Sequence, residues 1–395
     1  MKHVIISEAQ VKHYRLPFYM KLYEVLQRHD INLRVAYSNP VPSKGGEDDT
    51  RNLPQHCGFK VDGYWLWPER LVYQPLLRPY LRSDLVIADE GNRYVLNHVL
   101  MALSLIGVQR VAFWGLAENR RHDRLPVSEW YRAATLNWAT HWFAYTRRTA
   151  AYLESQGVPS SKITIVYNSV DTREITECVR GVTPREKVNL RLRLGIPANA
   201  TIGIFSGTLQ QDKCIPFLIK SSHLIKAQMP SFHLIIVGTG REREAIDHLV
   251  ECVPWIHVLG ARFGREKAEL LAIADAFLIP GRVGLAILDA FAAGIPIVTT
   301  RLETHGPEIE YLERNVNGVM SQHDPIAYAD TVSSLLCERG SLDRLRAGAI
   351  ASCDKYSIDN MVANFAEGIK ICLGMSRAEK PSCRQPTEEL GAIVE

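Results

Sequence analysis

The chain alternates short apolar runs with stretches of helical spacing along most of its length. The runs 4–7, 85–88 and 202–206 are rich in apolar and β-branched residues and are too short to be helices. The stretch 17–29, by contrast, carries apolar residues four positions apart. Strands that alternate with helices are typical of a parallel sheet with helices on both faces, so the pattern predicts an α/β protein. Further strands are expected at 33–37, 110–114, 143–146, 163–167, 233–237 and 256–259.

One stretch, 277–300, has the order strand, glycine turn, short helix, glycine and strand: FLIPGRVGLAILDAFAAGIPIVTT. Gly281 helps to break the first apolar run, and Gly294 is a natural helix end. Residues 283–286 would then form a helix N-terminus, where free backbone N–H groups favour an anion. Asp289 lies just over a turn further in. Taken alone, the stretch fits equally well a helix packed on a parallel sheet with a solvated Asp289.

The length, charge and cysteine pattern of the chain limit the class of protein to which it can belong. A chain of 395 residues with 46% hydrophobic and 23% charged residues is long enough for two α/β domains. A net charge of +3 is too mild to indicate nucleic-acid binding. The eight cysteines show neither C-x-x-C nor metal-ligand spacing, which favours reduced thiols over a disulfide framework. We expect neither a metal nor another cofactor.

Neither end of the chain nor its longest apolar run predicts a membrane span. The start, MKHVIISE, has too short an apolar core for a signal peptide, and 99–108 is far shorter than the ~20 residues that cross a bilayer. We expect a cytoplasmic protein, either soluble or attached to the inner face of the membrane. The basic loop 120–124 and the aromatic residues of 130–142 leave that contact open, and a solvated loop before a core helix explains them equally well.

The stretch 277–300 resembles the core motif of retaining GT-B glycosyltransferases of family 4. In that family a proline-ended strand leads into E-G-F-G-L, then a helix with a second Glu, then A-x-G-x-P. Two positions depart from it, since Gly281 stands at the first Glu and Asp289 at the second. The matching residues are Gly284, Leu285, Ala290, Ala293, Gly294 and Pro296.

These departures bear on the roles that the resemblance implies. In the family the second acid holds the ribose hydroxyls of the nucleotide, which Asp289 can still do. The first acid contacts the transferred sugar, and Gly281 has no carboxylate for it. The resemblance therefore leaves the sugar to the backbone amides of 282–285 or to another side chain.

Other motifs follow the order of the same family. GTLQQDK at 207–213 resembles G-R-L-x-x-x-K-G, whose Arg and Lys grip the donor diphosphate; Lys213 matches, and Thr208 replaces the Arg. A G-x-G turn follows at 238–240, and Arg243 stands where a dinucleotide fingerprint needs its third glycine. N-S-V-D, G-P-E-I and N-G also match at 168–171, 306–309 and 317–318. The predicted donor-binding residues are Gly207, Thr208, Lys213, Gly238, Gly240, Arg262, Val283, Gly284, Leu285 and Asp289.

The first half resembles the family only in outline. Loops at the carboxyl ends of its strands are where doubly wound sheets bind ligands, although a solvated loop and helix capping are the alternatives. In this sequence Leu116 stands at the position of the His in the family's W-G-H-G motif, so Glu118 or Asn119 is expected to take the role of that His. The predicted acceptor-binding residues are Lys12, His13, Tyr14, Arg15, Asp89, Glu90 and Asn119. The predicted catalytic residues are Lys213, Gly284 and Glu118.

The resemblance implies two Rossmann-like domains facing a cleft, the GT-B fold, with a last helix that crosses back to the first domain. We expect an acceptor domain at 1–180, a donor domain at 181–356 with a linker within 183–199, a crossover helix at 357–375, and a disordered tail at 376–395.

The implied activity is transfer of a sugar, with retention, from a UDP- or GDP-linked donor to a glycan or lipid-linked acceptor in polysaccharide or envelope glycan synthesis. No metal is expected, and the leaving phosphate would take the proton of the acceptor. Three alternatives stay open: a degenerate GT-B protein that binds without turnover, suggested by Gly281, Leu116 and Thr208; a sugar-nucleotide epimerase; and a Rossmann-type oxidoreductase, which the missing third glycine disfavours.

Overall fold

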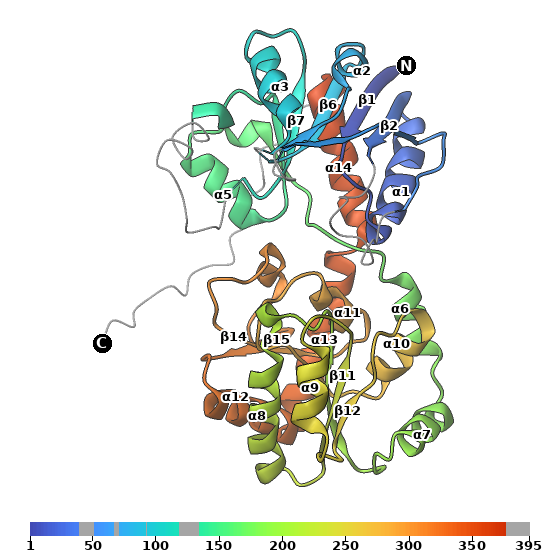
Figure 1. The fold of residues 1–395 in the computed structure, drawn as a ribbon, viewed down its shortest axis with the longest axis vertical. Coiled ribbons are helices and arrows are strands. Elements are labelled where there is room, and N and C mark those ends of the chain that lie inside the picture. The colour runs from blue at the N-terminus through green and yellow to red at the C-terminus, as the bar shows by residue number, and fades with distance from the viewer. Residues whose placement is uncertain (39–50, 67–70, 92, 118–133, 377–395) are drawn as a thin grey trace, which may run out of the picture.

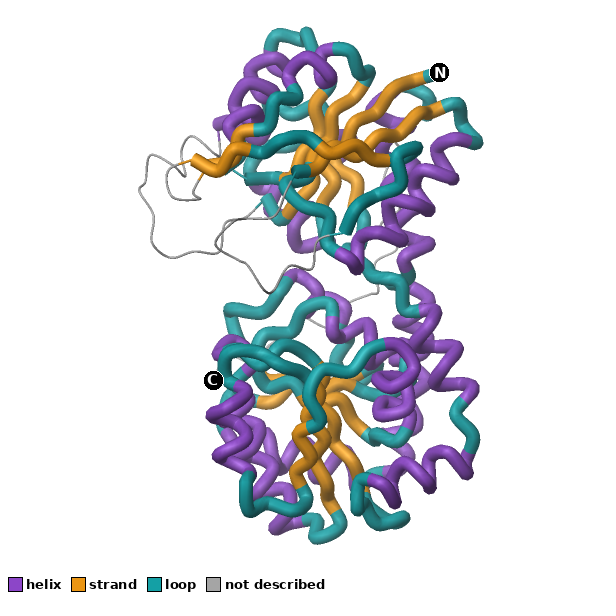
Figure 2. Tube along the Cα trace, turned by 45° about the vertical axis from the view of Figure 1, so that its right-hand side comes forward, coloured by secondary structure: helices purple, strands orange, loops and turns teal. Residues whose placement is uncertain are grey.

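The computed structural model describes residues 1–38, 51–66, 71–91, 93–117 and 134–376. The chain forms two α/β halves, one above the other in Figure 1, each built on a parallel sheet. In Figure 2 the strands lie inside each half and the helices mostly outside. The predictions for Glu118, Asn119, the basic loop 120–124 and residues 377–395 of the tail fall outside the described residues.

The first sheet has the strand order β3-β2-β1-β6-β7-β8-β9, with all neighbours parallel. Its strands are β1 (Lys2–Ser7), β2 (Ile31–Tyr37), β3 (Gly58–Lys60), β6 (Leu85–Asp89), β7 (Val111–Gly115), β8 (His141–Ala144) and β9 (Ile163–Ile165). The helices of this half are α1 (Leu16–Gln27), α2 (Leu77–Leu81), α3 (Val95–Leu105) and α5 (Arg147–Ser155), and a hairpin joins β4 (Tyr64–Leu66) to β5 (Leu71–Tyr73).

The second sheet repeats this plan in the order β12-β11-β10-β13-β14-β15, again all parallel. Its strands are β10 (Thr201–Ser206), β11 (Phe232–Val237), β12 (Ile256–Val258), β13 (Ala276–Leu278), β14 (Ile297–Thr300) and β15 (Gly318–Ser321). Its helices are α6 (Arg173–Gly181), α7 (Pro184–Arg193), α8 (Ile215–Gln228), α9 (Arg243–Val250), α10 (Gly264–Ala272), α11 (Ala286–Ala292), α12 (Pro325–Cys337) and α13 (Arg339–Lys355).

Both sheets reverse their strand order at a central pair, β1 with β6 and β10 with β13. Loops from the two strands of such a pair leave in opposite directions, so the carboxyl edge there is where open α/β sheets bind ligands. The fold therefore provides one such position in each half.

The core follows from the period-two pattern of the strands. Val4 and Ile6 of β1 pack into one buried cluster, and Ile5 packs into another on the opposite face. A strand covered on both faces needs apolar residues at consecutive positions, which explains the continuous apolar runs in the sequence.

The last helix, α14 (Ile358–Leu373), returns to the first half, as predicted, and packs beside α1 (Figure 1). Its Phe365 stacks on Phe143 of β8, with ring centroids 4.2 Å apart and planes at 6°. Phe18 of α1 and Trp114 of β7 pack edge-on against the same ring. These aromatic contacts anchor α14 to the first sheet.

The segment expected to be a linker within 183–199 contains a helix instead. α7 begins with a capping box, in which Thr183 and Glu186 satisfy each other's backbone N–H groups, and Pro184 occupies the first turn. Leu190 is buried in the core of the second half. The charge of this segment favours a linker, but T-x-x-E at 183–186 is a helix start.

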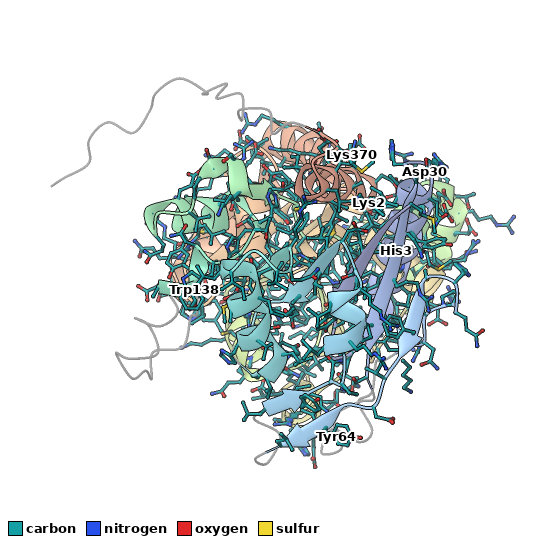
Figure 3. The ribbon with its side chains drawn as sticks, turned by 90° about the horizontal axis from the view of Figure 1, so that it is seen from above. Lys2, His3, Asp30, Tyr64, Trp138 and Lys370 are labelled. Atoms are coloured by element: carbon teal, nitrogen blue, oxygen red, sulfur yellow. The ribbon has the colours of Figure 1, made fainter. Side chains whose placement is uncertain are left out.

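In Figure 3, which views the molecule from above, Lys2 and Asp30 lie near Lys370 of α14, while Tyr64 of the hairpin lies at the opposite edge of the view. The backbone N–H of Lys2 donates to the backbone carbonyl of Asp30 at 2.9 Å.

Among the described residues, no helix combines the length and apolar character needed to cross a bilayer.

Candidate functional site

The loops after β10 and β13 meet at the reversal point of the second sheet. The first forms a 3₁₀ turn, η4 (Gln211–Lys213), and the second begins at Gly281. The N–H of Arg282 donates to the carbonyl of Asp212 at 2.7 Å. A Cβ on Gly281 would lie 2.3 Å from the carbonyl carbon of Lys213, so no side chain fits between the loops.

Lys213 is held where these loops meet. Its Nζ donates to the carbonyl of Arg282 at 2.7 Å and lies 3.8 Å from a carboxylate oxygen of Asp212. Burial lowers the pKa of Lys213, while the negative charges of Asp212 and Glu308 act in the opposite direction. The lysine therefore places a positive charge at a fixed point of the carboxyl edge.

The predicted glycines bring the neighbouring loops into direct backbone contact. Gly238 has a φ of 148°, and a Cβ there would lie 1.8 Å from the carbonyl oxygen of Gly207. A Cβ on Gly240 would lie 2.3 Å from the carbonyl oxygen of Leu209. Thr208 is exposed beside them. These residues build the floor of the loop cluster that carries Lys213.

The amides predicted to bind the donor are only partly available. The N–H of Val283 donates to Nδ1 of His305 at 3.1 Å, and Nε2 of His305 lies 2.7 Å from the carbonyl of Thr300. The N–H of Arg282 is likewise used inside the protein. Helix α11 begins at Ala286, later than predicted, with Leu285 as its N-cap. Gly284 and Leu285 therefore supply the amides still open to a ligand, with no acceptor among the described residues.

Asp289 lies in the first turn of α11 and pairs with Lys267 of α10, with a distance of 2.5 Å between Nζ and Oδ2. Both side chains are largely buried. Arg262, after β12, is half exposed and pairs with Glu266 at 3.7 Å. Within the described part of the chain, no ion pair or hydrogen bond joins Arg262 to Lys213 or Asp289.

Two carboxyl groups, those of Glu8 and Asp89, lie at the reversal point of the first sheet. Glu8 follows β1 and Asp89 ends β6, one position beyond the paired residues Ser7 and Ala88. The Tyr19 hydroxyl donates to Glu8 at 2.5 Å, and the Tyr94 hydroxyl donates to Asp89 at 2.6 Å.

Burial raises the pKa of both carboxyl groups, and the charge of Asp89 raises the pKa of Glu8 further. For Glu8 the pKa rises from 4.5 to about 7, because of burial first and the charge of Asp89 second. Burial also raises the pKa of Asp89, against the hydrogen bond from Tyr94 and the charges of Arg93 and Arg15. Glu8 can therefore keep a proton near neutral pH.

The other predicted acceptor residues have varied surroundings. Arg15 is buried, and its guanidinium carbon lies 4.4 Å from the centre of a Trp114 ring. Glu90 accepts a hydrogen bond from the N–H of Ala117 at 2.6 Å, so it holds the turn after β7. Lys12 and Tyr14 are half-buried next to Arg15, and His13 is exposed.

The two halves are joined through Glu308 and Glu310 of η5 (Pro307–Tyr311). Nδ2 of Asn168, which follows β9, donates to Glu308 at 2.6 Å, and the Tyr311 hydroxyl donates to the carbonyl of Asn168 at 2.9 Å. Glu310 accepts the first two N–H groups of α5, those of Arg147 and Arg148, at 3.0 and 2.9 Å.

Glu308 is also close to the charged groups of both halves. Burial raises its pKa, and the hydrogen bond from Asn168 together with the charges of Arg15 and Arg282 opposes that rise. The sequence indicates Glu308 and Asn168 only as motif positions, and Glu8 is not among the predicted site residues. The position of Glu8, directly after a buried parallel strand, was the available signal.

Two parallel Rossmann-like sheets with a returning C-terminal helix define the GT-B fold, as predicted. Residues 200–338 match the family model described as glycosyl transferases group 1. The chain is 27% identical over 225 residues to an uncharacterised glycosyltransferase of Methanocaldococcus jannaschii, which covers 55% of this chain and 56% of that protein. It is 28% identical over 218 residues to a D-inositol 3-phosphate glycosyltransferase of Xylanimonas cellulosilytica, covering 52% and 51%.

The chain thus spans about half the length of the curated relatives it matches. Solved structures are similar over almost the whole chain. A glycosyltransferase from Rickettsia africae superimposes with a TM-score of 0.71 at 12% identity, covering 95% of this chain and 99% of its own. HepE of Anabaena in complex with UDP superimposes with a TM-score of 0.68 at 16% identity, covering 94% and 100%. These likenesses support the fold.

Proposed function

We propose that the protein is a glycosyltransferase that moves a sugar from a nucleoside diphosphate sugar to a glycan or lipid-linked acceptor. The observation that carries the proposal is the position of Lys213. Its charge is fixed between two loops at the reversal point of the second sheet, within the residues that match the group 1 family model. A leaving diphosphate needs such a charge, because negative charge develops on it as the glycosidic bond breaks.

The diphosphate would lie against Lys213 and the amides of Gly284 and Leu285. A lysine supplies a compact point charge, and backbone amides supply directed hydrogen bonds to phosphate oxygens. Arg282 is half exposed beside Lys213 and adds positive charge at the same edge. Within the described residues no group of three His, Cys, Asp or Glu side chains is placed to bind a metal ion, and transfer without a metal stays a prediction.

Asp289 would hold the ribose. A carboxylate accepts hydrogen bonds from two neighbouring hydroxyls, and the ion pair with Lys267 at 2.5 Å holds the Asp289 side chain in place. HepE of Anabaena was solved with UDP and with UDP-glucose, so a UDP-linked donor is the first to test, with a GDP-linked donor second.

The acceptor would bind at the reversal point of the first sheet. Glu8 and Asp89 offer carboxyl oxygens that accept hydrogen bonds from sugar hydroxyls, and Arg15 offers a donor beside them. Retention of configuration is proposed because the motifs resemble those of retaining enzymes. The reaction route that this resemblance implies needs no nucleophile from the protein. A role in polysaccharide or envelope glycan synthesis and contact with a membrane belong to the same proposal.

One observation favours a second candidate, a GT-B protein that binds sugar nucleotides without turnover. The close packing of Gly281 on Lys213 leaves no space for the carboxylate that the resemblance expects there. Proton NMR of UDP-glucose incubated with the protein separates the two. A retaining transferase slowly passes the sugar to water, and the first free sugar formed has the anomeric configuration of the donor.

Release of the opposite anomer would contradict retention. Binding of UDP-glucose with no release over days favours the binding protein without turnover. Lys213→Ala is expected to abolish release, whereas Lys220→Ala, which removes an exposed lysine of α8, is expected to leave it unchanged.

A further inference from the structure

Three buried polar groups lie close to the place where the two halves join. Asn168, Arg15 and Glu308 have exposed fractions of 4%, 8% and 5%. The hydrogen bond from Asn168 to Glu308, 2.6 Å long, links two of them. The charge of Arg15 lies close enough to Glu308 to affect its ionisation. Arg15 belongs to the first half and Glu308 to the second, so this cluster is shared between the halves.

Two atoms of this cluster have no hydrogen-bond partner among the described residues. One is Nη1 of Arg15, a donor, and the other is Oδ1 of Asn168, an acceptor. A buried polar group without a partner destabilises the folded protein, and two such groups in one cluster call for an explanation. A ligand that supplies both an acceptor and a donor would satisfy them.

The chemistry of the cluster selects the kind of ligand. The diphosphate of a sugar nucleotide has no O–H group near neutral pH and only accepts hydrogen bonds, so it could pair with Arg15 but not with the Asn168 oxygen or with an ionised Glu308. A hydroxyl both donates and accepts and can pair with all three. The unsatisfied atoms therefore fit a group of hydroxyls, such as a sugar ring.

The position of the cluster relates it to the proposed diphosphate site. Glu308 exerts its charge on Lys213, and its Oε2 lies 4.0 Å from the point that a Cβ on Gly284 would occupy. A Cβ on Gly306 would lie 2.7 Å from the same oxygen, so glycine at 306 leaves the carboxylate its place. A group bonded to a diphosphate at Lys213 and Gly284 would reach Glu308.

We propose that Glu308, with Arg15 and Asn168, binds the hydroxyls of the transferred sugar, the contact for which Gly281 has no side chain. This inference rests on the proposed function. A sugar held in this way is enclosed by both halves, which removes water from the bond to be broken.

The test measures the affinity of UDP and of UDP-glucose, and in parallel of GDP and GDP-mannose, by calorimetry. Glu308→Gln should weaken binding of the sugar nucleotide about tenfold, since a hydrogen bond to a charged group is worth ~1.5–3 kcal/mol, and should change binding of the free nucleotide less than twofold. Arg15→Lys, which keeps the charge and removes Nη1, should act in the same direction.

Glu310→Gln is the matched control, because Glu310 also joins the halves but does so through the amides of Arg147 and Arg148. It should leave the ratio of the two affinities unchanged. The melting temperature of each variant reports whether it folds, and Arg15→Lys serves as the test if Glu308→Gln does not.

The outcomes separate the two proposals. If the wild type binds no nucleoside diphosphate and no sugar nucleotide, the proposed function fails and this inference fails with it. If the wild type binds both, and Glu308→Gln weakens both equally or neither, the inference alone is overturned and Glu308 only holds the halves together. Selective loss of the sugar nucleotide supports it.

Discussion

Gly281 and Lys213 are packed so closely that a Cβ on Gly281 would lie 2.3 Å from the carbonyl carbon of Lys213. The glycine is therefore a requirement of the turn that fixes the lysine. Gly281 stands at the position where the resemblance expects a glutamate, and its lack of a side chain allows the two loops to come into close contact. This contact ties the stability of the protein to the geometry of the proposed diphosphate site.

Gly281→Ala should lower the free energy of unfolding by ~1–3 kcal/mol, because the methyl group forces the turn at Lys213 away from the loop after β13. Urea unfolding measures this. Gly340→Ala is the control, since a Cβ at this position in the first turn of α13 meets no atom within 4 Å, and it should not lower the stability. Equal stability of Gly281→Ala and wild type would contradict the packing described here.

Phe365→Ala should cost about 3–5 kcal/mol of unfolding free energy, because the ring is buried against Phe143, Phe18 and Trp114. The same urea experiment measures it. Phe263→Ala removes a ring that is 74% exposed and should change stability by less than about 0.5 kcal/mol. Similar losses for both variants would mean that α14 contributes little to holding the first half together.

The contribution of Glu8 to the free energy of unfolding should decrease as the pH rises from about 4.5 to about 7. In the folded state its pKa is about 7, raised from 4.5 by burial and the charge of Asp89, with the Tyr19 hydrogen bond and the charges of Arg15 and Arg93 acting against the rise. The folded state binds more protons than the unfolded state across this window, so the free energy of unfolding decreases with pH.

Urea unfolding at pH 5 and pH 8 checks this prediction. Glu8→Gln should reduce the difference between the two values, because its amide does not titrate. Glu24→Gln, which alters an exposed carboxylate of α1, should leave the difference as in the wild type. If Glu8→Gln and Glu24→Gln behave alike, Glu8 is ionised throughout this range.

Asp289→Asn should remove the preference of the protein for a ribose. The wild type should bind UDP about tenfold more tightly than 2′-deoxy-UDP, since the carboxylate accepts a hydrogen bond from the 2′-hydroxyl. The variant should bind both similarly. Asp330→Asn is the control, because Asp330 lies exposed on α12 and bonds to Gln228 at 2.7 Å. A preference that survives Asp289→Asn would place the ribose elsewhere.

The sequence predicts the second half better than the first. In the stretch 277–300, glycines before and after α11 indicate where the helix begins and ends. The structure has β13, α11 and β14 in this stretch, as predicted. The reversal points follow from strand order, which no local pattern encodes. Helix α7 was not predicted, because the many charged residues of its segment favour a linker even though a capping box begins the helix.

The contacts of the site depend on distant residues and could not be predicted from spacing. Asn168 and Glu308 are 140 positions apart and come together only when the halves meet. The use of the Val283 N–H by His305 is likewise invisible in the motif, which predicted a free amide. Motif reasoning identifies which loops carry a site, but tertiary packing decides which of their atoms are left for a ligand.

The proposed diphosphate site is tested most directly by calorimetric binding of UDP and GDP to the wild type, Lys213→Ala and Lys220→Ala. We expect one nucleotide to bind the wild type and Lys220→Ala equally, and to bind Lys213→Ala about 10- to 100-fold more weakly, because a bond of ~1.5–3 kcal/mol to a charged group is lost. Binding that is the same in all three proteins, or absent from the wild type at millimolar nucleotide, would contradict this proposal.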